Sequence, residues 1–298
     1  MRVWEAASGK QLQVFQVQRQ LPWAMALSPD GKTLATGSFD KTIKVFDTGT
    51  GKEPRTLTGH IREVSGLAFS PDGRRLVSID QDGVARMWDT ATWEVLQKWG
   101  GPRYIKPGEF SAEGNPSFSP DGKWLAIRGA ARDVWVFDAQ TARVVRRLTV
   151  EKPSGEHRIL PLGPASVAHD SQRIVAFDSG GKMLVWETSN WKRKDVALSG
   201  IRTRQGWYWP SAIALSPDDR LLAMATGENA YIVELASGKK LLTLSGHTGG
   251  VWALAFSPDG RWLATGATDD VVMLWDVATG RAIRRLGTRP PPREMTDY

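Results

Sequence analysis

Residues 251–276 decide the fold, and they read VWALAFSPDGRWLATGATDDVVMLWD. The stretch contains short runs rich in β-branched and aromatic residues, each bounded by turn formers such as Ser257–Gly260. With the residues that follow, the predicted strands are 251–256, 262–267, 271–275 and 282–286. Because the linking turns are short, neighbouring strands run antiparallel. The segment therefore predicts a four-stranded antiparallel sheet.

The same pattern recurs along the chain every 41 to 50 residues. Copies of Ser-Pro-Asp-Gly begin at Ser28, Ser70, Ser119 and Ser257, a near copy begins at Ser216, and a degenerate copy occupies 169–172. A second motif, an aromatic residue followed by an acidic one, also recurs along the chain. It occurs at Trp4-Glu5, Phe46-Asp47, Trp88-Asp89, Phe137-Asp138, Trp186-Glu187 and Trp275-Asp276, and Val233-Glu234 is a degenerate copy. Such a period indicates a repeat fold. One four-stranded sheet cannot bury both faces, so the units are predicted to stack radially as an all-β propeller.

The amino-acid composition excludes several kinds of functional site. The chain has 298 residues and no cysteine, which excludes disulfides, thiolate metal sites and a cysteine nucleophile. No segment approaches the roughly 20 apolar residues that a bilayer span needs, so membrane insertion is not expected. The first residues carry no apolar signal segment. We therefore expect a cytoplasmic protein.

Several motif elements carry a resemblance to a known family. Gly59-His60, Gly246-His247, the Ser-Pro-Asp-Gly turns and the Trp-Asp endings resemble the WD-repeat β-propeller family across residues 1 to about 287. The resemblance implies a buried hydrogen-bond chain of His, Ser or Thr, Asp and Trp within a unit. The matching residues are His60, Ser78, Asp82 and Trp88 in one unit and His247, Thr265, Asp269 and Trp275 in another, with Thr36, Asp40 and Phe46 as a partial set. The units around Phe137, Trp186 and Val233 have largely lost it.

The strand count leaves two arrangements open. Residues 1–288 are expected to form the propeller, as a partial unit over 1–20 followed by six units, and residues 289–298 form a Pro-rich flexible tail. The pattern contains seven third-and-fourth strand pairs but six first-and-second pairs. We favour seven blades with an incomplete first blade, as in most of the family. The alternative is six blades plus a spare N-terminal hairpin, and membership in a larger multidomain chain or complex stays open.

Catalysis is not expected from the polar residues. A catalytic triad of a hydrolase could be read into His60, Ser78 and Asp82. The same residue types recur around His247, however, and this recurrence favours a structural hydrogen-bond network. The other histidines, His157 and His169, lack metal-ligand spacing, and no phosphate-binding glycine motif is present. We expect no metal and no cofactor, and a propeller enzyme is the less favoured alternative.

Function is expected in the loops, because the strands are committed to packing. In the family that the chain resembles, one face is formed by the loops that lead into the first strands and by those joining second and third strands; we call it the loop face. Three loops leading into first strands are long: 100–112, 150–164 and 199–210. The expected partner-binding residues are Arg62, Arg103, Tyr104, Arg158, Arg202, Arg204, Trp207, Tyr208 and Trp252. These indicate an interaction scaffold that binds a peptide or protein.

The net charge of +7 and pI near 9.7 also suit a nucleic acid or an anionic surface. Charges in the loop-face segments cancel, however. The excess lies near the fourth strands and the tail, for example at Arg143, Arg146, Arg147, Lys192, Arg193, Lys194, Lys239, Lys240, Arg281, Arg284 and Arg285. Charged outer edges discourage edge-to-edge aggregation. Binding of nucleic acid through this basic rim is therefore the alternative, not the expectation.

Overall fold

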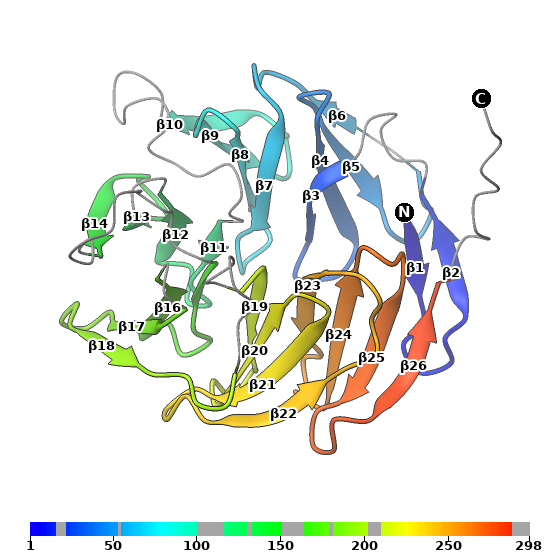
Figure 1. Cartoon of the computed structure of the whole chain (residues 1–298). Helices are drawn as coiled ribbons and strands as arrows, with labels where there is room; N and C mark the ends of the chain where they lie inside the picture. The colour runs from blue at the N-terminus through cyan, green and yellow to red at the C-terminus, as the bar shows by residue number, and fades with distance from the viewer. Residues whose placement is uncertain are drawn as a thin grey trace, which may run out of the picture. The chain divides into compact units, whose positions relative to one another are not determined.

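The computed structural model describes residues 1–15, 22–52, 55–99, 116–129, 133–150, 164–178, 181–201 and 210–287 (Figure 1). All regular secondary structure in these residues is β-strand. The described residues form one two-stranded sheet and six four-stranded antiparallel sheets, each a meander in chain order. This confirms the all-β propeller architecture. It matches the arrangement of six blades plus an N-terminal hairpin.

The hairpin and the first three four-stranded sheets, called blades 1 to 3, occupy the N-terminal half. The hairpin consists of β1 (Arg2–Trp4) and β2 (Gln11–Val14). Blade 1 consists of β3 (Pro22–Leu27), β4 (Thr33–Ser38), β5 (Ile43–Asp47) and β6 (Arg55–Leu57). Blade 2 consists of β7 (Val64–Phe69), β8 (Arg75–Asp80), β9 (Ala85–Asp89) and β10 (Val95–Trp99). Blade 3 consists of β11 (Ser117–Phe118), β12 (Trp124–Arg128), β13 (Asp133–Asp138) and β14 (Val144–Thr149).

Blades 4 to 6 follow the same plan. Blade 4 consists of β15 (Ala165–Val167), β16 (Arg173–Phe177), β17 (Met183–Glu187) and β18 (Arg193–Val196). Blade 5 consists of β19 (Ala212–Leu215), β20 (Leu221–Thr226), β21 (Asn229–Glu234) and β22 (Lys240–Leu244). Blade 6 consists of β23 (Val251–Phe256), β24 (Trp262–Ala267), β25 (Val272–Asp276) and β26 (Ala282–Leu286). Contacts divide the chain into two compact units, Met1–Val3 with Leu12–Ser179 and Leu184–Lys194, and Trp4–Gln11 with Gly180–Met183 and Asp195–Tyr298.

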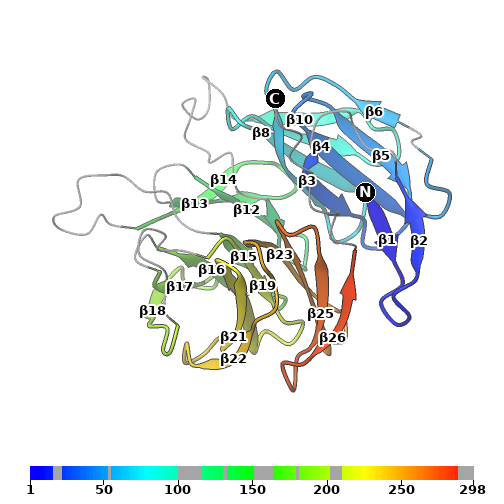
Figure 2. The same ribbon diagram turned by 45° about the vertical axis from the view of Figure 1, so that its right-hand side comes forward.

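Blades pack through apolar side chains, mainly from their first, second and third strands. Within the first unit, Ala35 and Val45 of blade 1 join Leu67 and Trp88 of blade 2 in one buried cluster. The two ends of the hairpin, Met1–Val3 and the residues from Leu12 on, belong to the same unit, where Phe15 lies edge-on to Phe46 with 5.5 Å between ring centroids. Figure 2 shows the hairpin strands β1 and β2 side by side. Burying such side chains contributes roughly 1.5 to 3 kcal/mol each, which makes blade stacking the main source of stability.

Two kinds of turn close each blade, and a carboxylate organises each kind. In the turn between first and second strands, the Ser70 hydroxyl donates to Asp72 Oδ1 at 2.5 Å and accepts from the Arg75 N–H at 3.0 Å. In the turn between third and fourth strands, the Thr50 hydroxyl and N–H donate to Asp47 Oδ1 at 2.8 and 2.7 Å. Local side-chain bonds of this type fix a turn at little entropic cost.

These hydrogen bonds lower the pKa of the turn aspartates, and they predict the response to acid. The serine or threonine bond is the largest cause at Asp30, Asp47, Asp72, Asp138, Asp218, Asp259 and Asp276, and the Thr92 N–H is the largest at Asp89. A pKa lower in the folded than in the unfolded chain, where it is about 3.9, contributes stability that is present above that value and lost as pH falls through the folded pKa. Denaturant unfolding at pH 7, 5, 4 and 3 should show constant stability to about pH 5 and a decline below about pH 4. Unchanged stability at pH 3 would contradict this account.

Candidate functional site

Blade 2 contains a buried chain of polar side chains. His60 precedes β7, Ser78 and Asp80 lie on β8, and Trp88 lies on β9. Ser78 Oγ accepts from Trp88 Nε1 at 2.8 Å and lies 2.7 Å from His60 Nε2. His60 Nδ1 lies 2.8 Å from Asp80 Oδ2. The chain joins all three inner strands of the blade and satisfies polar groups that are shielded from water.

The acid in this chain is Asp80, which corrects the prediction of Asp82. Residues two apart on a strand face the same side, so Ser78 and Asp80, at the end of β8, both face His60. Asp82 lies beyond the strand in the turn, where its half-exposed carboxylate is 3.6 Å from Arg62 Nε. Asp80 Oδ1 also accepts from the Val84 N–H at 2.9 Å, so this side chain fixes the turn as well.

Blade 6 contains the corresponding chain, with its acid in the turn. Thr265 Oγ1 lies 2.7 Å from His247 Nε2 and accepts from Trp275 Nε1 at 2.9 Å. Asp269 Oδ2 lies 3.1 Å from His247 Nδ1 and accepts from the Thr248 N–H at 2.9 Å. Burial works against ionisation of Asp269, but these bonds outweigh it and keep its pKa below the ordinary value. The position that Asp80 holds in blade 2 is Ala267 here, so the turn supplies the carboxylate.

The partial set in blade 1 lacks a histidine. Thr36 is fully buried on β4, and Phe46 packs in the cluster formed with the hairpin. Asp40 instead fixes its own turn, where Oδ1 accepts from the Thr42 N–H at 2.9 Å. The hydroxyls of these chains are buried, so the arrangement holds strands together and presents no nucleophile to solvent.

Two of the predicted partner-binding residues lie in the described part of the chain. The Arg62 side chain is half-exposed at the start of blade 2, with Nε 3.4 Å from Glu63 Oε2. Trp252, on the first strand of blade 6, is 61% exposed. The others, Arg103, Tyr104, Arg158, Arg202, Arg204, Trp207 and Tyr208, lie outside the described residues, as does the tail 289–298.

Two β-bulges, each at the start of its blade's first strand, place a tryptophan in solvent. The pairing of β3 with β4 shifts between Pro22 and Ala24, and that of β23 with β24 shifts between Val251 and Ala253. The skipped residues are Trp23, which is 43% exposed, and Trp252. Bulges re-aim side chains in this way and are common beside functional sites. Trp23 is not among the contact residues predicted from the sequence, although it lies five residues before its Ser-Pro-Asp-Gly turn, as Trp252 does.

Blade 2 has a bulge at the same position, but the residue in it is not a tryptophan. Its skipped residue is Ser65, which is buried and donates to the Ile79 carbonyl at 3.3 Å. A small polar residue therefore suffices for the backbone at this position. The bulge in blade 2 thus forms without an exposed aromatic residue, which makes Trp23 and Trp252 candidate contact residues in the described chain.

Trp23 has an aromatic partner on the loop face of blade 1. Its ring stacks on Phe39, in the loop between β4 and β5, with centroids 4.5 Å apart and planes at 25°. Both rings remain exposed. Close by, Gly37 approaches blade 2 so tightly that a Cβ would lie 2.6 Å from Val64 Cγ1. This contact brings the Phe39 loop next to the start of β7, which Ile61 and Arg62 precede.

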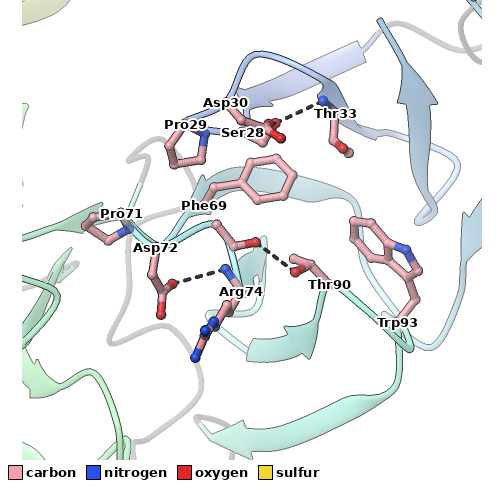
Figure 3. A pocket seen from close by; sticks show the side chains of 11 residues that line it. Ser28, Pro29, Asp30, Thr33, Phe69, Pro71, Asp72, Arg74, Thr90 and Trp93 are labelled. Atoms are coloured by element: carbon pink, nitrogen blue, oxygen red, sulfur yellow. Dashed lines mark hydrogen bonds between the residues drawn. The ribbon is translucent and has the colours of Figure 1, made fainter.

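A pocket of about 320 Å³ lies at the opposite end of the strands (Figure 3). It is formed by the turns of blades 1 and 2, with Phe69 and Trp93 in its wall. Its polar groups bond to one another: Thr33 N–H to Ser28 Oγ at 2.9 Å, Arg74 N–H to Asp72 Oδ1 at 3.0 Å and Thr90 Oγ1 to the Gly73 carbonyl at 2.7 Å. Because these polar groups already hydrogen-bond within the turns, few of them are left to orient a ligand in the pocket.

The described ranges also bear on metal binding and membrane insertion. No group of three or more His, Asp or Glu side chains is placed to hold a metal ion there. In that same part of the chain, no helix is long and apolar enough to cross a membrane.

Four-stranded antiparallel blades, two of them joined internally by a His–hydroxyl–Trp chain, define a repeat-built β-propeller. The family model "WD domain, G-beta repeat" matches residues 9–47, 51–89 and 238–276. These segments contain blade 1, blade 2 and blade 6 strands, including both complete polar chains. These matches confirm the resemblance to the WD-repeat β-propeller family over these three segments.

Three curated relatives show the range of proteins that this chain resembles. It is 32% identical over 138 residues to the "Target of rapamycin complex subunit wat1" of Schizosaccharomyces pombe, covering 44% of this chain and 41% of the relative. It is 26% identical to the human "Serine-threonine kinase receptor-associated protein", covering 94% and 61%. It is 28% identical to the "Nuclear distribution protein nudF" of Emericella nidulans, covering 88% and 61%. The chain thus spans 41% to 61% of the length of these relatives.

Proposed function

We propose that this propeller is a non-catalytic scaffold that binds a peptide or protein on its loop face. The observation that carries the proposal is the exposure of Trp23 and Trp252 at bulges where Ser65 shows that a small residue suffices. Large aromatic side chains concentrate binding energy in protein interfaces. Arg202 and Trp207 remain part of the proposed surface on the basis of their sequence.

The names of the relatives support this class of function. One is a subunit of a complex and another is a receptor-associated protein. Both names describe association with other proteins, and this chain is proposed to share that property. The partner is defined only by chemistry: it should offer an apolar side chain to the Trp23–Phe39 stack, because two exposed rings with centroids 4.5 Å apart form an apolar platform.

The contacts of Ser78 support the absence of catalysis. A nucleophilic serine must be reached by its substrate. Ser78 is fully buried, and its oxygen already contacts both His60 and Trp88. The proposal therefore assigns the polar chains to stability, and it includes the expected cytoplasmic location, which cell fractionation would test.

The contacts of outer-strand cations weigh against a polyanion as the main ligand. Arg147 Nε lies 2.5 Å from Asp133 Oδ2, and its guanidinium lies over the Trp135 ring at 4.6 Å. Arg284 donates to the Ser8 carbonyl at 2.8 Å. Both cations serve contacts within the chain. Binding to the true partner should accordingly weaken far less with salt than the steep fall typical of nucleic acids.

The double variant Trp23→Ala with Phe39→Ala tests the proposal. Captured partner from the native host, quantified by mass spectrometry, should fall at least about tenfold, as for loss of an interface hot spot. Leu96→Ala on β10 is the matched control, since it removes an exposed apolar side chain away from the loop face. The variant Arg202→Glu with Trp207→Ala should reduce capture as well. Unchanged capture by both loop-face variants, with intact circular dichroism, would overturn the proposal.

A further inference from the structure

Three loop-face segments of blades 5 and 6 meet around Trp252. On one side, the Val251 N–H donates to the carbonyl of Gly227, in the turn between β20 and β21, at 2.8 Å. On the other side, the N–H of Thr268, in the loop between β24 and β25, donates to the Gly250 carbonyl at 2.9 Å. All of these residues belong to the second compact unit. We call the segments 227–228, 250–252 and 268–270 the Trp252 surface.

The Trp252 ring is open to a ligand. Its side chain is 61% exposed. In blade 1 the equivalent ring, Trp23, stacks on Phe39, but blade 6 has Thr268 at the position of Phe39, counted from the turn serine. Among the described residues, no aromatic ring and no cation lies over Trp252. An exposed indole face is the aromatic surface that attracts a cation most strongly.

Two exposed carboxylates lie in the segments on either side of this ring. Glu228 is the second residue of the two-residue turn between β20 and β21, directly after Gly227, whose φ is +60°. Asp270 lies two residues after Thr268 and is exposed as well. Neither carboxylate pairs with a side chain in the described part of the chain. Both charges are therefore available to a ligand that covers Trp252.

The backbone does not require a carboxylate at position 270. Asp270 has a φ of +61°, and the equivalent residues, counted from the turn serine, are Lys41 in blade 1 with +69° and Gly83 in blade 2 with +72°. The same left-handed conformation thus accepts a cation, an anion or no side chain at all. The negative charge beside Trp252 is a property of blade 6 and not of the turn.

The charge of this surface is opposite to that of the chain. The described loop-face segments of blades 5 and 6 are 210–212, 227–229, 245–252 and 268–271, and they contain the acids Glu228, Asp269 and Asp270 but no lysine or arginine. The whole chain carries a net charge of +7. A cationic ligand is therefore attracted here by local charge, while the chain as a whole repels it.

Blade 3 combines the same two groups around a guanidinium. The Arg147 guanidinium lies over the Trp135 ring at 4.6 Å, and its Nε lies 2.5 Å from Asp133 Oδ2. A guanidinium is planar, so it can stack on an indole while its N–H groups donate to carboxylates at its edge, which the compact ammonium of lysine cannot do. An indole face with carboxylates beside it therefore favours arginine.

We propose that the Trp252 surface binds an arginine side chain of a partner polypeptide. This inference rests on the proposed function and names one contact within it. The guanidinium stacks on the Trp252 ring and donates to Glu228 and Asp270. The Trp23–Phe39 stack takes an apolar side chain instead, because it has Lys41 where blade 6 has Asp270. The partner is thus a polypeptide that presents arginine in an exposed segment.

Binding of a defined peptide to the whole 298-residue chain tests this assignment. The probe is a fluorescently labelled peptide in which three arginines alternate with alanines, and anisotropy measures its binding. It should bind saturably, with a Kd below about 1 mM. The same peptide with citrulline, a neutral isostere, in place of arginine should bind at least about tenfold more weakly, and a lysine version about threefold more weakly. Absence of binding up to about 1 mM, or equal binding of the citrulline peptide, would overturn the proposal, and equal binding of the lysine peptide would overturn the assignment to arginine.

A ring variant places the probe on Trp252. Trp252→Ala should weaken binding of the arginine peptide about three- to thirtyfold, as for loss of a cation–π contact. Trp23→Ala is the matched control, since it removes the equivalent exposed tryptophan from a surface with Lys41 beside it. It should leave binding of the probe unchanged. Equal binding by Trp252→Ala and the wild type would overturn the proposal.

Charge variants test the two carboxylates. Asp270→Gly suits the positive φ, as Gly83 does in blade 2, so the fold should persist, and thermal unfolding checks this. Combined with Glu228→Gln, it should weaken binding of the arginine peptide at least about fivefold. Glu94→Gln is the control, because it removes an exposed carboxylate from the turn between β9 and β10, at the end of blade 2 opposite its loop face. Equal effects of the control and the double variant would contradict a local site.

Photo-cross-linking tests the natural occupant. A photoreactive phenylalanine analogue at Val272, which is exposed close to Asp270, should form an adduct in the native host with another polypeptide at a segment that contains arginine. Asp270→Lys should abolish the adduct. A cross-linked dimer of this chain, or a cross-link within one chain, would overturn the assignment to a partner. If the adduct is absent while Trp23→Ala with Phe39→Ala still reduces capture, this inference fails and the proposed function stands.

Discussion

Replacing Asp80 with alanine is expected to lower the free energy of unfolding by about 2 to 5 kcal/mol, because each buried donor left without its acceptor costs roughly 1 to 3 kcal/mol. The carboxylate is fully buried, bonds to His60 Nδ1 at 2.8 Å and accepts the Val84 N–H at 2.9 Å. The variant leaves both donors without a partner in a site that water does not reach. Denaturant unfolding measures the change.

Asp82→Ala is the matched control for this variant. Asp82 is half-exposed, and its contact to Arg62 spans 3.6 Å, so its removal should cost less than about 1 kcal/mol. The predicted assignment of Asp82 to the buried chain would require the reverse order. A larger loss for Asp82→Ala than for Asp80→Ala would therefore contradict the structure.

Replacing Leu125 with alanine is expected to cost about 3 to 5 kcal/mol, through lost burial and the cavity that remains. Leu125 is fully buried on β12, in the cluster that joins blade 2 to blade 3. Its neighbours Val77 and Phe137 come from different blades, so the cavity weakens the interface between them. Urea unfolding measures the loss.

Leu96→Ala provides the comparison for the core variant. Leu96 lies on the outer strand β10 and is half-exposed, so its truncation should cost less than about 1 kcal/mol. Equal losses for Leu96→Ala and Leu125→Ala would indicate that stability does not come from packing between blades.

The turns and strands could be predicted from the sequence because local chemistry sets them. The expected strands 251–256, 262–267 and 282–286 coincide with β23, β24 and β26. Each Ser-Pro-Asp-Gly turn is fixed by bonds within a few residues, such as Ser257 to Asp259 at 2.5 Å. Turns that depend only on neighbouring residues can be predicted from a single sequence.

The acid of blade 2 shows where pattern matching failed. The prediction used one offset, four residues after the hydroxyl, for both blades, and this gave Asp269 and Asp82. Alternation along a strand favours the residue two positions after the hydroxyl, which is Asp80 in blade 2 but Ala267 in blade 6. Strand geometry applied at each blade separately would have found Asp80.

The candidate contact residues could be predicted only in part. Trp252 was selected and Trp23 was not, although both hold the same position before a turn serine. The exposure of Met25 and Leu27 is a tertiary property that alternation alone does not report. The structural role of Arg284 could not be predicted, because it depends on a hydrogen bond to the carbonyl of Ser8, which is 276 residues away in the sequence.

The central claim is that the loop face of this propeller binds another polypeptide, and cross-linking from Phe39 tests it most directly. A photoreactive phenylalanine analogue at Phe39, activated in the native host, should give an adduct with a partner that the Trp23→Ala variant reduces. The same analogue at Leu96 should give little or none. An adduct from Leu96 with none from Phe39 would contradict the claim, as would the absence of any adduct from Phe39.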